Sequence, residues 1–87
     1  MTDHNDNIAQ LLRKAYSLHE QGNWVEAERL YRHLLEIEPR HAEALYLLGT
    51  GLAQHGDPAA AVGLFRQAIE AGADSAAVRV NLGNALI

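Results

Sequence analysis

The sequence predicts an all-α fold of about five helices, arranged as antiparallel helix-turn-helix hairpins stacked in an α-solenoid with a right-handed superhelical path. Three observations support this prediction. The chain is similar to itself at an offset of 34 residues without a gap, apolar residues recur at helical spacing within each unit, and turn-forming residues separate the apolar segments.

The 34-residue offset aligns mostly small and apolar residues, which set the distances between packed helices. It pairs Leu11 with Leu45, Leu18 with Leu52, Gly22 with Gly56, Ala27 with Ala61, Leu30 with Leu64 and Tyr31 with Phe65. A second step of the same length places Leu48, Gly49 and Leu52 on Leu82, Gly83 and Leu86. We therefore divide the chain into a flexible N-terminal arm at 1–7, repeat 1 at 8–41, repeat 2 at 42–75 and the first helix of a truncated repeat 3 at 76–87, the repeats forming one structural domain.

Repeat 1 contains two predicted helices. Apolar residues at helical spacing predict a first helix over 8–21. Asn23 is placed to cap a second helix over 24–37, and Glu26 completes the pattern of a capping box. Pro39 ends this helix, because proline cannot continue it.

Repeat 2 follows the same plan. A helix over 42–55 ends before the turn at Gly56. Asp57 is placed to cap the next helix, 58–71. Pro58 occupies the first position of this helix, where a backbone N–H would have no acceptor within the helix, so its absence in proline costs nothing.

A fifth helix begins at Asp74 or Ser75 and continues to Ile87. The second helix of that hairpin would cover Leu82, Leu86 and part of Ile87, so we expect an apolar strip on the fifth helix. We expect the chain to be a piece of a longer repeat protein and to form a homodimer through these three residues. A frayed helix end on a monomer is the alternative.

Small residues are predicted at the close contacts between helices. These are Ala15, Gly49 and Gly83 on the first helices of the hairpins, and Ala27, Ala61 and Ala68 on the second helices. They allow the helix axes to approach, so we assign them to packing.

Composition excludes several classes of function. The chain has no cysteine, which rules out disulfides, thiolate metal ligands and a cysteine nucleophile. Seven basic against eleven acidic residues give a net charge of −4, which disfavours nucleic acid as a partner. The sequence has no apolar segment of membrane-spanning length and no signal pattern, so we expect a soluble, cytoplasmic protein without membrane contact.

No pattern in the sequence predicts catalysis, a cofactor or a metal site. Gly49-Thr50-Gly51 falls within a helix and lacks the lysine of a phosphate-binding loop. The pairs Glu28–Arg32 and Glu36–Arg40 have the spacing of solvated ion pairs on one helix. No two of the five histidines have the spacing of a helical metal-binding pair; they are His4, His19, His33, His41 and His55.

The repeat pattern resembles a tetratricopeptide repeat. In repeat 2 the resemblance rests on Leu45-x-x-Leu48-Gly49-x-x-Leu52, Gly56, Ala61-x-x-x-Phe65 and Ala68. In repeat 1 it rests on Leu11, Leu18, Gly22, Ala27-x-x-x-Tyr31 and Pro39, and repeat 3 opens with Asn81-Leu82-Gly83-Asn84-Ala85. The resemblance covers about 8–87.

The resemblance implies a protein-protein interaction module in which the first helix of each repeat lines a groove for a peptide or a partner helix. The implied groove residues are Leu12, Tyr16, Tyr46, Leu47, Thr50, Asn81 and Asn84. An alternative is that the chain is the N-terminal repeat segment of a larger enzyme, for example a transferase.

Two specialised subclasses of the family use particular polar residues in the groove. The positions that clamp a chaperone's C-terminal carboxylate are here Leu12, Tyr16, Leu47, Ala77 and Asn81, so the resemblance does not extend to that clamp. The asparagine ladder of peptide-glycosylating transferases is matched by Asn81 alone, since Arg13 and Leu47 occupy the other places.

Overall fold

The computed structural model describes residues 4–73 and 76–86. Within these residues the chain forms five α-helices and no strand, which confirms the predicted fold class. The helices are α1 (His4–Glu20), α2 (Trp24–Ile37), α3 (Ala42–Gln54), α4 (Pro58–Glu70) and α5 (Ala76–Leu86).

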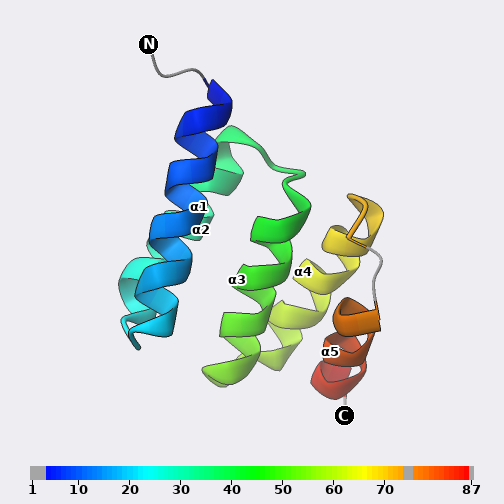
Figure 1. Cartoon of the computed structure of the whole chain (residues 1–87). Coiled ribbons are helices and arrows are strands. Elements are labelled where there is room, and N and C mark those ends of the chain that lie inside the picture. The colour runs from blue at the N-terminus through cyan, green and yellow to red at the C-terminus, as the bar shows by residue number, and fades with distance from the viewer. Residues whose placement is uncertain (1–3, 74–75, 87) are drawn as a thin grey trace.

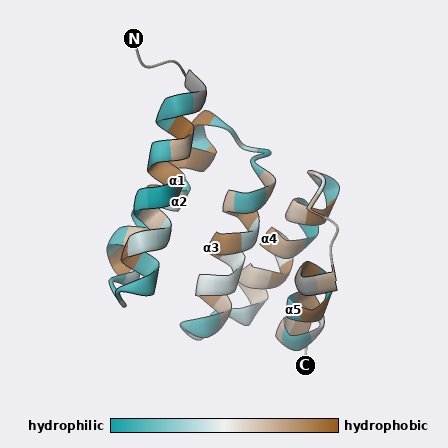
Figure 2. Ribbon diagram, in the orientation of Figure 1, coloured by the Kyte–Doolittle hydropathy of each residue, from teal (hydrophilic) through white to brown (hydrophobic). Residues whose placement is uncertain are grey.

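Consecutive helices pack against one another as antiparallel hairpins. In Figure 1, α1, α3 and α5 lie side by side on one face, and α2 and α4 lie behind them. Figure 2 shows that α1 alternates between hydrophilic and hydrophobic turns, whereas α3 has few hydrophilic positions. The two helices differ because α1 lies at the end of the stack and exposes one side to solvent, whereas α3 is enclosed by neighbouring helices on several sides.

The core repeats with the period seen in the sequence. Tyr31 and Phe65, which are 34 residues apart, are both fully buried. Ala27 and Ala61, the matching small residues on the same two helices, are also fully buried. The second helix of each hairpin therefore packs through one aromatic and one small residue, as predicted.

The first helix begins earlier than predicted. It starts at His4, so residues 4–7 of the expected arm are helical, and residues 1–3 lie outside the described part of the chain. Asp6 stands in the first turn, where a negative charge favours the helix N-terminus. One turn further, Ile8 is only 4% exposed and packs with Leu34 and Ala44, which anchors this end of α1.

The predicted caps are confirmed at one helix and wrong at another. The Asp57 side chain accepts a hydrogen bond from the backbone N–H of Ala60 at 3.3 Å, as a cap of α4 should. Asn23 stands at the N-cap position of α2, but its side chain makes no capping hydrogen bond, and Glu26 pairs with Arg29 at 2.8 Å. The capping box is therefore not formed.

A cap that the sequence analysis did not predict begins α3. The His41 Nδ1 accepts a hydrogen bond from the backbone N–H of Ala44 at 3.1 Å. The two tight turns within the hairpins contain Gly22 and Gly56 with φ of 83° and 90°, a backbone conformation that glycine adopts without strain. The predicted start of α5 at Asp74 or Ser75 lies outside the described residues.

Candidate binding groove

The face formed by α1, α3 and α5 is hollowed in two places, and we call this face the groove. The hollow between α1 and α3 has a volume of about 670 Å³ and is lined by Leu12, Arg13, Tyr16, Ser17, Glu20, Glu43 and Leu47. The hollow between α3 and α5 has a volume of about 300 Å³ and is lined by Thr50, Ala53, Gln54, Pro58, Phe65, Asn81, Asn84 and Ala85. Volumes of this order accommodate ligand groups the size of several side chains.

Most of the residues that the resemblance implied for the groove line these hollows. Leu12, Tyr16 and Leu47 line the α1–α3 hollow, and Thr50, Asn81 and Asn84 line the α3–α5 hollow. Each of the three helices on this face contributes to at least one hollow, because their equivalent positions point to the same side of the stack.

Tyr46 has a different environment from the one expected. Its hydroxyl accepts a hydrogen bond from Asn81 Nδ2 at 2.8 Å, and its ring lies 6.0 Å from that of Phe65. The Thr50 hydroxyl donates to the backbone oxygen of Tyr46 at 2.9 Å. Tyr46 is half-buried and joins α3 to α5, and its hydroxyl already accepts one hydrogen bond within the chain.

Tyr16 is the more open of the two tyrosines. Its side chain is 45% exposed in the α1–α3 hollow. A hydrogen bond to the Glu20 carboxylate, one turn later in α1, raises the pKa of Tyr16, and the negative charge of Glu20 adds to this effect. The hydroxyl of Tyr16 is thus engaged with Glu20, while its ring is available for contact.

A third tyrosine lies beneath the same hollow. Tyr31 of α2 is fully buried, and burial raises its pKa to about 12, with smaller contributions from Tyr16, Glu43 and Glu20. Those three residues all line the α1–α3 hollow, whereas Tyr31 itself is fully buried and is not among its lining residues.

An aromatic cluster joins the first hairpin to the C-terminal end of α3. Trp24 stacks on His55 with ring centroids 5.1 Å apart and an angle of 7° between planes, and His19 packs on Trp24 at 5.1 Å. His19 Nε2 is 2.8 Å from Gln54 Oε1. Gly51 lies directly under Trp24, where any Cβ would overlap the indole ring.

Sequence reasoning missed this cluster. The sequence pattern shows only that His19 and His55 do not form a helical metal-binding pair, and it gives Trp24 no role. The signal available was Gly51 in the middle of a helix, because a glycine at such a position often marks a close approach.

The comparison with protein families agrees with this arrangement. The family model described as Tetratricopeptide repeat matches residues 7–74, which is most of the chain. The chain belongs to the tetratricopeptide repeat family. A search of curated proteins found no match to this chain. Membership supports a general role as a protein-interaction scaffold, since repeats of this family are typically non-catalytic interaction modules.

The tetratricopeptide repeat groove of this chain is apolar at the places where other members clamp a carboxylate. Leu12, Tyr16 and Leu47 present alkyl and phenol groups to the α1–α3 hollow. Asn81 is polar, but its amide donates to Tyr46. The charged groups of the hollow are instead Arg13, Glu20 and Glu43.

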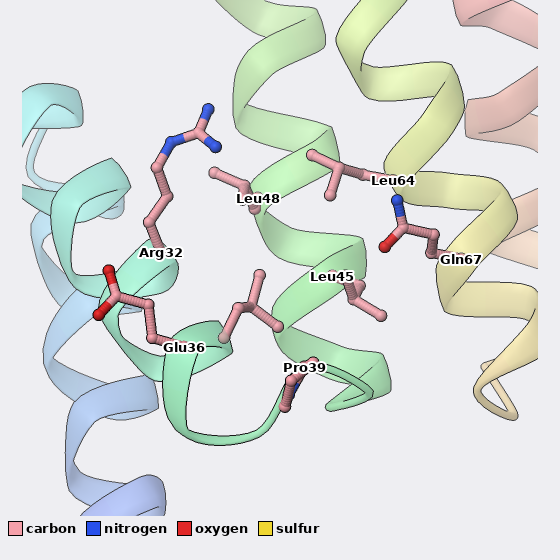
Figure 3. A pocket seen from close by; sticks show the side chains of 8 residues that line it. Arg32, Glu36, Pro39, Leu45, Leu48, Leu64 and Gln67 are labelled. Atoms are coloured by element: carbon pink, nitrogen blue, oxygen red, sulfur yellow. The ribbon is translucent and has the colours of Figure 1, made fainter.

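The opposite face of the tetratricopeptide repeat array has a cleft between α2 and α4, shown in Figure 3. Its volume is about 410 Å³, and Leu45 and Leu48 of α3 stand between the two flanking helices. The full lining is Arg32, Leu35, Glu36, Pro39, Leu45, Leu48, Leu64 and Gln67. Arg32 is held by Glu28 of its own helix at 2.7 Å, as the spacing predicts.

The residues predicted for self-association differ in their environments. Leu82 is half-buried and packs against the core, whereas Leu86 is 56% exposed. Val80 of the same helix is 59% exposed, and a Cβ added at Gly83 would meet no atom within 4 Å. Ile87 lies outside the described residues.

Two kinds of feature are absent from the described residues. No group of three or more potential metal ligands comes together in the part of the chain that the structure describes. Among the described helices, none combines the length and apolar character needed to cross a membrane.

Proposed function

We propose that the chain is a protein-interaction module that binds a peptide or a partner helix along the groove. The observation that carries this proposal is the alignment of two hollows on one face, with Tyr16 45% exposed in the larger of them. A half-exposed aromatic side chain offers a large contact area at little conformational cost, which is typical of residues that dominate binding energy.

The proposal rests more on Tyr16 than on Tyr46. Replacing Tyr46 would remove the hydrogen bond from Asn81 and the contact with Phe65, so a loss of binding would not separate recognition from folding. Tyr16 packs less tightly, and its truncation leaves the hairpin contacts in place.

The test uses peptides selected from a random dodecapeptide phage library with the wild-type chain as bait. We expect Tyr16→Ala to weaken their affinity by about tenfold, since truncating a central aromatic contact has effects of this order. The matched control is Val25→Ala, because Val25 is 75% exposed on α2, outside both groove hollows. Equal affinities for the wild type and the Tyr16 variant, or failure to select any peptide, would refute the proposal.

We also propose that α5 mediates self-association, most simply as a two-fold dimer. Exposed Leu86 and Val80, with open space at Gly83, favour this second function. Sedimentation at high micromolar concentration should show a dimer, and Leu86→Glu should dissociate it. A monomer throughout that concentration range would contradict the proposal without affecting the groove.

A further inference from the structure

The first helices of the hairpins meet at two junctions, α1 against α3 and α3 against α5, and the two junctions differ in their side chains. In the α3–α5 junction the ring of Tyr46 lies 6.0 Å from the ring of Phe65. The Tyr46 hydroxyl accepts a hydrogen bond from Asn81 Nδ2 at 2.8 Å. An aromatic side chain of the chain itself therefore bridges this junction.

The α1–α3 junction lacks such a ring. The 34-residue offset places Leu12 at the position of Tyr46 and Leu47 at the position of Asn81. Both leucines are half-buried, and neither has a ring or a polar atom with which to bridge the junction. The hollow that they line has a volume of about 670 Å³, whereas the α3–α5 hollow has a volume of about 300 Å³. The larger space thus occurs where the chain lacks the bridging ring.

We propose that the α1–α3 hollow receives an aromatic side chain of a partner peptide, in the place that corresponds to that of the Tyr46 ring. This proposal rests on the proposed groove function and names the type of residue that the groove recognises. The second junction indicates the occupant, because an aromatic ring lies at the equivalent place between the next two first helices.

The residues that line the α1–α3 hollow suit an aromatic ring. Leu12 and Leu47 offer apolar surface on opposite helices. The ring of Tyr16 is 45% exposed in the same hollow, and a pair of aromatic rings is stabilised beyond the apolar area that it buries. A phenyl ring needs no hydrogen-bond partner, which agrees with the presence of Leu47 at the position that Asn81 occupies one repeat later.

The first experiment examines the dodecapeptides that the wild-type chain selects from the random phage library. Peptides whose affinity falls with Tyr16→Ala are expected to be enriched in phenylalanine, tyrosine and tryptophan over the starting library. A labelled representative peptide, and a version with its aromatic residue replaced by leucine, are then titrated by fluorescence anisotropy. The leucine version should bind about two- to tenfold more weakly, which is the range expected from the loss of an aromatic pair.

The second experiment fills the hollow from within the chain. Leu12→Phe places a ring at the position that Tyr46 occupies one repeat later, and Leu12→Tyr combined with Leu47→Asn recreates both members of the Tyr46–Asn81 pair. Both variants should weaken the aromatic peptide by about tenfold or more, because the place of its ring is then occupied. Leu12→Met is the matched control, since it conserves the volume and the apolar character of the side chain without adding a ring. It should leave the affinity within about twofold of the wild type.

The outcomes separate this proposal from the groove function. Melting curves followed by circular dichroism establish which variants are folded, and the peptide titrations decide the question if the ring-bearing variants are not. Tyr16-dependent peptides without aromatic enrichment, equal affinities of the aromatic peptide and its leucine version, or unchanged affinity of a folded Leu12→Phe variant would each overturn the aromatic-ligand proposal alone. Failure to select any Tyr16-dependent peptide would overturn both proposals.

Discussion

Trp24 is positioned by a residue that has no side chain of its own. Its indole lies over Gly51 and contacts the rings of His19 and His55. Sequence periodicity did not predict this contact, because the 34-residue offset places Trp24 on Pro58 and His19 on Ala53. Aligning the repeats detects only residues that recur, so it cannot detect a contact that is made in one repeat alone.

Gly51→Ala should therefore destabilise the fold even though alanine is the better helix former. We expect the free energy of unfolding to fall by about 1–3 kcal/mol, because the new methyl group overpacks the indole. Gly63→Ala, in α4 with open space around its Cβ, should instead raise it by about 0.5–1 kcal/mol. Urea denaturation measures both, and changes of the same sign would contradict the described position of Trp24.

A second prediction for a single residue concerns the effect of Tyr31 on the pH dependence of stability. Its pKa is raised from 10.0 to about 12 in the fold, so the folded chain holds this proton more tightly than the unfolded chain. Stability from this group is fully present below pH 10 and is lost as the pH rises toward 12. The expected loss is about 1–3 kcal/mol over that range.

Tyr31→Phe should lack this loss. At pH 7 it should be about 1 kcal/mol more stable than the wild type, because it removes a buried unpaired hydroxyl. Chemical denaturation at several pH values compares the two proteins. Parallel pH profiles would show that Tyr31 is not the group responsible.

At the scale of helices, the sequence pattern predicted the C-terminal ends of α1 to α4 better than the start of α1. The observed C-terminal ends of α1 to α4 lie within one residue of the predicted ends, because glycine and proline mark them. The start of α1 was predicted too late, since the first apolar residue was taken as its beginning and a first turn needs none. The Asp57 side chain caps α4, whereas the Asn23 side chain makes no capping hydrogen bond at α2 and Glu26 pairs with Arg29, so the predicted capping box is not formed.

The register of α4 is tested by two alanines of the same helix. Ala61 is fully buried and Ala59 is exposed. Ala61→Leu should lower the free energy of unfolding by about 1–3 kcal/mol through overpacking. Ala59→Leu should change it by less than about 0.5 kcal/mol. Similar shifts in melting temperature for the two variants would contradict the register.

At the scale of the whole molecule, the repeat pattern predicted which residues share a face, but not which of them are free to bind. Equivalent positions on α1, α3 and α5 point to one side, so six of the seven residues implied for the groove line its hollows. The hydrogen bond from Asn81 to Tyr46 joins different repeats, and the sequence carries no pairing signal for it.

Besides the groove, the array has other hollows, among them the α2–α4 cleft of Figure 3, and we assign binding to the groove. The most direct test is a titration of the ¹⁵N-labelled chain with a selected dodecapeptide, followed by amide chemical shifts. We predict that the largest shifts occur at Leu12, Tyr16 and Leu47, with little change at Arg32 and Gln67. Largest shifts at Arg32 and Gln67, with the groove residues unchanged, would contradict the central claim.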